Sequence, residues 1–127
     1  MTHPLISRIS VIILGIVLIV FGIYHFVAPE NLMAYVPDFL PGGKLWVYLA
    51  GAAFILAAIA FIIHKQVRLA AYLLAFLLLI FILAIHLPNV LHAGSAEVKQ
   101  LELVNLLKDT ALAAFALYIG SNAKSFE

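Results

Sequence analysis

The sequence predicts an all-α integral membrane protein, a four-helix bundle of up-down-up-down topology with a short cap segment on the outer side. Two observations predict this fold. Hydrophobic residues make up 66% of the 127 residues and charged residues only 10%, whereas soluble domains are about half apolar. The apolar residues also fall into four runs of about 20 residues, the length that crosses a bilayer as a helix. We expect transmembrane helices at about residues 9–27, 45–63, 69–87 and 101–120, forming one domain over residues 1–127.

The composition also limits the possible functions. The formal net charge is only +1, which gives no reason to expect a nucleic acid as a partner. The chain has no cysteine, which excludes thiol redox chemistry, disulfides and iron–sulfur ligation. The four spans leave no room for a soluble catalytic module.

The first span follows a short segment in which Arg8 is the only lysine or arginine. Its apolar core is too long for a signal peptide and lacks a small-residue cleavage site, so we expect it to stay as a helix. Gly15 and Gly22 lie seven residues apart on one face. They either let a neighbouring helix approach closely or are ordinary glycines of a membrane helix.

The connection over residues 28–44 contains three prolines and a Gly-Gly pair, which rule out a continuous helix. Pro29 and Glu30 suit the first turn of a short helix that runs to about Val36. We interpret this segment as a cap or lid over the outer end of the bundle.

The remaining spans are bounded by recognisable signals. The second begins with Trp46, an aromatic residue typical of the membrane interface, and a tight polar loop, residues 64–68, follows it. The third span ends before Pro88. A polar connection over residues 90–100 leads to the fourth span, which we expect Gly120 to end.

The lysines and arginines predict the orientation. Four cations, Arg8, Lys65, Arg68 and Lys124, lie at the N-terminus, in the second connection and at the C-terminus, whereas the first and third connections together hold two lysines against three acids. The positive-inside rule therefore places both termini in the cytoplasm. The cap then faces outward.

The fourth span carries polar residues that are costly in lipid: Glu102, Asn105, Lys108 and Asp109. An ionised residue at the centre of a spanning helix costs about 2.5–3.5 kcal/mol on insertion scales, so such residues normally face a bundle interior or a cavity. At about 100° per residue, the two acids and the asparagine share an arc of about 60°. We expect the other helices to shelter this arc.

His25 and His86 each lie near the outer end of a span. Counted at about 1.5 Å per residue from the inner cations, both lie at the depth of Asn105, about 26–28 Å. Similar segments follow the two histidines, and the second of these contains Asn89. This similarity indicates a parallel two-helix repeat that turns both rings toward a common space, where each bonds Asn105, Asp109 or a ligand.

These residues form a candidate ligand site: His25, His86, Asn89, Glu102, Asn105, Lys108 and Asp109. Two interpretations stay open, a small-molecule pocket or polar groups that bond one another and hold the helices together. Haem between two histidines is conceivable, but no other haem signature is present. No helix carries a His-x-x-x-His or Glu-x-x-His pair, so the sequence predicts no metal site.

Short motifs along the whole chain match a known family: the helix end at 22–29, Val-Pro-x-Phe-Leu-Pro at 36–41, Leu-Ala-Ala at 69–71, Ala-Ile-His-Leu-Pro at 84–88 and Asn-Leu-Leu-Lys-Asp at 105–109. In these motifs the chain resembles the DoxX-like family of small four-helix bacterial membrane proteins. The resemblance implies a multi-pass protein of the bacterial inner membrane that is associated with membrane redox complexes. The chain departs from the family at Gly51-Ala-Ala, where members carry a glutamate after the glycine. This departure and the absence of cysteine weigh against autonomous catalysis.

Three functions follow from these observations. The first is an oxidoreductase-associated subunit with an outer-leaflet pocket for a quinone-like or other amphiphilic ligand, whose carbonyls accept hydrogen bonds from the site. The second is a non-catalytic assembly or lipid-handling protein with a structural polar cluster. A channel or transporter is disfavoured, because no polar stripe reaches the cytoplasmic side. The partners expected are the lipid bilayer and subunits of a redox complex, and association with further copies of the chain stays open.

Overall fold

The computed structural model describes residues 4–33, 36 and 41–125, and these residues form helices and no strand. Four helical spans are long and apolar enough to cross a membrane, so the predicted all-α, multi-pass membrane fold is confirmed. The elements are α1 (Pro4–Val27), α2 (Pro29–Met33), α3 (Gly43–Ile63), α4 (Val67–Phe81), the π-helical turn η1 (Ile82–His86), α5 (Leu87–Leu91), α6 (Ala96–Ser121) and the 3-10 turn η2 (Ala123–Ser125).

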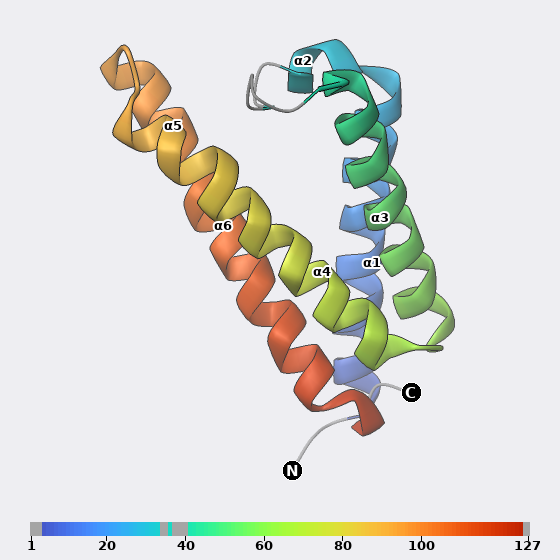
Figure 1. Cartoon of the computed structure of the whole chain (residues 1–127). Helices are drawn as coiled ribbons and strands as arrows, with labels where there is room; N and C mark the ends of the chain where they lie inside the picture. Colours follow the sequence, from blue (N-terminus) through green and yellow to red (C-terminus); the bar gives the residue numbers. More distant parts are fainter. Residues whose placement is uncertain (1–3, 34–35, 37–40, 126–127) are drawn as a thin grey trace.

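The four spans run up-down-up-down as two antiparallel hairpins (Figure 1). In the first hairpin α1 packs along α3, and in the second α4, η1 and α5 pack along α6. The start of α1 and the end of α6 lie together at one end of the molecule, which we call the terminal end; α2 lies at the other, the cap end. The hairpins meet near the terminal end and diverge toward the cap end.

An apolar core joins the two hairpins. Its largest fully buried side chains include one from each span: Leu18, Phe61, Leu78 and Ile119. Phe54 of α3 extends this core, because its ring lies 6.3 Å from the ring of Phe21 and 6.1 Å from that of Phe81. The contact between Phe54 and Phe81 joins the first hairpin to the second.

Glycines let the helices of the first hairpin approach closely, as one of the two readings of Gly15 and Gly22 predicted. A Cβ atom at Gly22 would lie 2.9 Å from the carbonyl oxygen of Gly51 and 2.5 Å from the side chain of Ile55. The side chain could move, but the carbonyl belongs to the backbone of α3. The two helices can therefore keep this spacing only while position 22 lacks a side chain.

We expect Gly22→Ala to lower the free energy of unfolding by about 1–3 kcal/mol, the usual cost of overpacking a packed core. Gly94→Ala is the matched control, because a Cβ atom there meets nothing within 4 Å. Unfolding of the purified variants by increasing SDS in mixed micelles, followed by circular dichroism, measures both. Equal midpoints for the two variants would contradict the close-approach argument.

Two of the spans begin well before their predicted starts. The helix α1 starts at Pro4 rather than near residue 9, and α6 starts at Ala96 rather than near residue 101. At α6 the Ser95 hydroxyl caps the helix by accepting a hydrogen bond from the backbone N–H of Val98 at 3.2 Å. Hydropathy alone placed residues 96–100 in the connection, because this first turn is exposed and polar.

The third span runs to Leu91 and does not end before Pro88 as predicted. Pro88 occupies the first turn of α5, where a missing N–H is tolerated. In a regular α-helix its ring would crowd the carbonyl of Ala84 and leave that carbonyl without a donor. The preceding turn is widened instead into the π-helix η1, in which the N–H of Leu87 bonds the carbonyl of Ile82.

Gly120 does not end α6, which continues to Ser121. A Cβ atom at this position would lie 2.6 Å from the ring of Tyr72. Gly120 is therefore a packing position between α6 and α4 rather than the helix stop that we predicted.

The cap begins with α2 at Pro29, as predicted. The predicted continuation of this helix to Val36 passes through residues 34–35, which lie outside the described residues, as do residues 37–40 of the proposed lid. Lys44 Nζ lies 3.3 Å from Glu30 Oε1 and ties α2 to the start of α3. A hydrogen bond from its own backbone N–H, followed by that from Lys44, lowers the pKa of Glu30.

Candidate functional site

Polar side chains meet between α6 and the η1–α5 segment of the second hairpin. We call this set the polar cluster: His86, Asn89, Glu102, Asn105 and Asp109. The exposed fractions of Glu102, Asp109 and His86 are only 2%, 4% and 9%. Two carboxylates buried this deeply are strongly destabilising unless other groups compensate their charge.

His86 lies between the two carboxylates. Its Nε2 atom is 3.0 Å from Asp109 Oδ2, and its Nδ1 atom is 3.6 Å from Glu102 Oε2. A neutral imidazole donates from one ring nitrogen, whereas an imidazolium donates from both. The protonated ring therefore matches both carboxylates at once.

Two amides complete the surroundings of Glu102. Asn89 Nδ2 donates to Oε2 at 2.5 Å, and Asn105 Nδ2 donates to Oε1 at 3.0 Å. The first bond comes from α5 and the second from the same helix as Glu102. Both carboxylate oxygens thus accept hydrogen bonds, and one of these bonds holds α5 against α6.

The local structure of each segment explains how these groups meet. On α6 the spacing of residues 102, 105 and 109 places them on one face, as the sequence predicted. On the opposing segment His86 is the last residue of the π-turn, and Asn89 follows one turn later in α5. Single π-turns re-aim side chains and occur frequently at functional sites.

Lys108 links the polar cluster to the first hairpin. Its Nζ atom lies 3.5 Å from Asp109 Oδ1 and 5.0 Å from the centroid of the Phe21 ring on α1. An ammonium at this distance from an aromatic face makes a favourable cation–π contact. The lysine therefore compensates one buried carboxylate while touching the opposite hairpin.

His25 bonds neither Asn105 nor Asp109, two of the three partners that we expected for its ring, the third being a ligand. Its Nδ1 atom donates to the backbone carbonyl of Phe21 at 2.6 Å, and its ring packs edge-on against Phe54 at 5.3 Å between centroids. The cause is the close contact of the first hairpin, since His25 lies directly over Gly51. The structure thus brings together six of the seven predicted site residues and places the seventh in the packing between α1 and α3.

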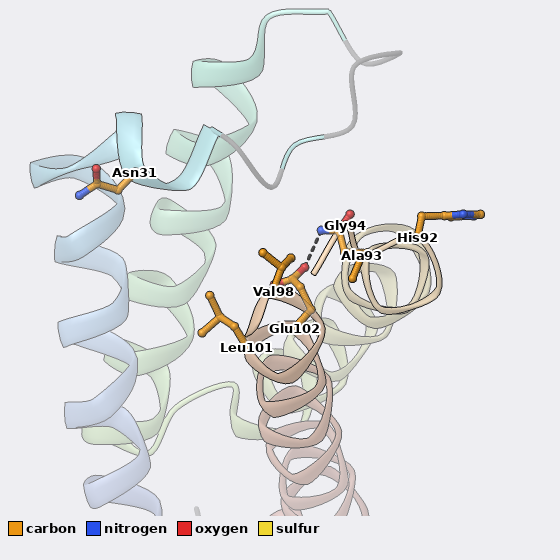
Figure 2. A pocket seen from close by; sticks show the side chains of 8 residues that line it. Asn31, His92, Ala93, Gly94, Val98, Leu101 and Glu102 are labelled. Atoms are coloured by element: carbon orange, nitrogen blue, oxygen red, sulfur yellow. Dashed lines mark hydrogen bonds between the residues drawn. The ribbon is translucent and has the colours of Figure 1, made fainter. Parts of the chain in front are cut away.

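A cavity of about 360 Å³ opens beside the polar cluster (Figure 2). Figure 2 shows Val98, Leu101 and Glu102 along α6, with Asn31 on α2 opposite them and the ring of His92 turned away from Glu102. The cavity therefore has aliphatic walls and a polar end. It is lined by Asn31, Asn89, His92, Ala93, Gly94, Val98, Leu101 and Glu102.

Sequence reasoning missed the walls of this cavity. Val98 lies one helical turn before Glu102 on the same face of α6, but its turn was assigned to the connection. Ser95 was the signal that could have found it, because a serine at the N-cap with an acid such as Glu97 in the first turn marks a helix start. Asn31 gives no comparable signal in the sequence.

The same geometry bears on metals and haem. Among the residues that the structure describes, no three His, Asp or Glu side chains are grouped so as to hold a metal ion. Haem between His25 and His86 requires a ring nitrogen of each aimed at one iron. His86 presents its two nitrogens to carboxylates and His25 directs Nδ1 to a backbone carbonyl, so the arrangement does not fit haem.

Comparison with known proteins places the chain in a family. A family model described as a domain of unknown function, DUF8561, matches residues 14–120. The chain belongs to this family. The match runs from Leu14 in α1 to Gly120 in α6, so the DUF8561 region includes the polar cluster and most of each span. No curated protein and no solved structure matches the chain.

Proposed function

We propose that this protein binds a quinone-like amphiphile in the cavity beside the polar cluster, as part of a membrane redox function. One observation carries the proposal: Glu102 is a buried member of the polar cluster and also lines the cavity. A ligand in the cavity would therefore contact a hydrogen-bonded, charged network inside an otherwise apolar bundle. Such convergence of a few polar groups on an apolar pocket is typical of ligand sites.

The cavity suits the chemistry of a quinone head. Its volume falls in the range of about 300–1,000 Å³ found for small-molecule pockets. The Asn89 amide has two N–H donors and directs one to Glu102, so the other can serve a ligand carbonyl. Val98 and Leu101 provide aliphatic contact for a ring. The cavity lies at the cap end of the spans, where a head can meet the interface while its tail stays in lipid.

The resemblance to the DoxX-like family supports the redox part of the proposal. It favours a non-autonomous subunit associated with an oxidoreductase over an independent enzyme. It also favours the bacterial inner membrane as the location. The distribution of lysine and arginine supports cytoplasmic termini, with the cap end outward.

Filling the cavity tests the proposal. We expect Val98→Phe to weaken the binding of decylubiquinone at least about tenfold, the loss of about 1.4 kcal/mol, because the larger ring occupies the ligand's space. Val104→Phe is the matched control, since both valines are half-exposed on α6 at 47% and 54%, and position 104 does not line the cavity. Equilibrium binding to the purified protein in mild detergent measures both. Absence of binding to the wild type, or equal affinity of the two variants, would refute the proposal.

A second function is favoured by one specific observation. The members of the polar cluster already bond one another, so they can hold α5 and α6 together without a ligand. This supports the alternative of an assembly or lipid-handling protein. Co-purification of a stoichiometric partner or lipid, together with absence of quinone binding, would favour this alternative.

A further inference from the structure

We propose that Glu102, His86 and Asp109 share one exchangeable proton, and that this proton selects which amphiphile head the cavity accepts. With the proton present the cavity binds heads that only accept hydrogen bonds, such as carbonyls. Without the proton it prefers heads that donate, such as hydroxyls. The inference rests on the proposed function and adds to it a specificity and a dependence on pH.

A charge count supports the shared proton. Two ionised carboxylates and the Lys108 ammonium carry a net charge of −1 when His86 is neutral, and zero when His86 is protonated. A net charge in a buried membrane site is costly. Because His86 contacts both acids, one proton can neutralise the whole set from a central position.

Charged side chains approach His86 from α6, which contributes Glu102, Asp109 and Lys108. The segment α5 contributes the neutral Asn89. On the side of α1, Lys108 lies over the Phe21 ring, and His25 bonds the Phe21 carbonyl. The ring of His92 points away from Glu102.

The cavity senses this proton through Glu102. When His86 is protonated, Glu102 is compensated and Asn89 can donate to a ligand carbonyl. When the proton is lost, an acceptor head faces an uncompensated carboxylate, which repels its lone pairs. A hydroxyl head instead donates to that carboxylate, and a hydrogen bond to a charged group is stronger than one between neutral groups.

The sign of the pH dependence follows from linkage. A head that prefers the protonated cluster takes up a proton on binding, so its affinity falls as the pH rises. A head that prefers the deprotonated cluster shows the reverse. For one linked proton the affinity changes by at most about tenfold per pH unit.

A matched pair of probes tests the inference: decylubiquinone, which has carbonyls, and decylubiquinol, which has hydroxyls, measured anaerobically on the full-length protein in detergent. The ratio of the quinone Kd to the quinol Kd should rise at least about tenfold between about pH 5 and 8. Glu102→Gln should flatten the profile. Glu97→Gln, an exposed acid in the first turn of the same helix, should not.

The outcomes separate the two proposals. Binding of both probes with a ratio that does not change with pH would overturn the shared proton and leave the proposed function standing. If neither probe binds at any pH, the shared proton and the proposed function are both overturned. The wild-type profile alone decides between these results, so an unfolded Glu102→Gln protein would not remove the test.

Discussion

Replacing Asp109 with leucine is expected to lower the free energy of unfolding by about 3–5 kcal/mol, the range measured when one partner of a buried ion pair is removed. The substitution leaves His86 Nε2 and the Lys108 ammonium facing an apolar side chain. Both groups then lose the carboxylate at 3.0 and 3.5 Å that compensates them. SDS titration in mixed micelles measures the change. Thr110→Leu, at the exposed neighbouring position, is the control and should cost far less.

Replacing the three buried titratable residues together should reverse most of this loss. Apolar side chains of similar volume in place of a buried ionic set are often neutral or stabilising, so His86→Leu, Glu102→Leu and Asp109→Leu combined should be more stable than Asp109→Leu alone. Quinone binding should be lost in both proteins. A triple variant as unstable as the single one would show that the polar contacts themselves hold the second hairpin together.

This comparison separates the two proposed functions. If the polar cluster serves only as a structural lock, the apolar triple variant should retain whatever activity the protein has, because its helices still pack. If the polar cluster serves a ligand, the triple variant should be stable and inactive. The cost of burying two carboxylates is then explained by binding rather than by folding, as expected for ionisable residues inside membrane spans.

The features that the sequence predicted well are those that depend on local periodicity. The number of spans follows from hydropathy over about 20 residues, and the shared face of Glu102, Asn105 and Asp109 follows from the pitch of one helix. The number of spans and the shared face can each be predicted without knowledge of a neighbouring helix, and the structure reproduces both features.

The features that were predicted wrongly depend on contacts between helices or on the backbone. Counting residues from the inner cations estimates the height of His25 but not its rotation about the helix axis. That rotation is fixed by the contact of Gly22 and His25 with Gly51. The π-turn before Pro88 adds to the difficulty, because a proline in a hydrophobic run predicts an end or a kink and does not specify a widened turn.

The π-turn before Pro88 leads to a second prediction with a large expected effect, a loss of quinone affinity on substitution of this proline. Pro88→Ala restores an N–H that can bond the carbonyl of Ala84, and it removes the ring that crowds this carbonyl. The π-turn can then relax to an α-helix, which changes the direction of side chains across the turn by up to about 100°. His86 would turn away from Asp109, and we expect quinone affinity to fall by about 10–100-fold, the equivalent of losing one charge-assisted hydrogen bond.

Leu83→Ala is the control for this substitution, because it changes an exposed side chain of the same π-turn and keeps Pro88. It should bind decylubiquinone as the wild type does. The helix gains a backbone hydrogen bond in Pro88→Ala, so its stability should change less than its affinity. A Pro88→Ala protein with full affinity would show that packing against α6, rather than the proline, aims His86. Reduced affinity with retained stability would show that Pro88 disrupts the regular α-helix in a way that positions the His86 imidazole between the two carboxylates.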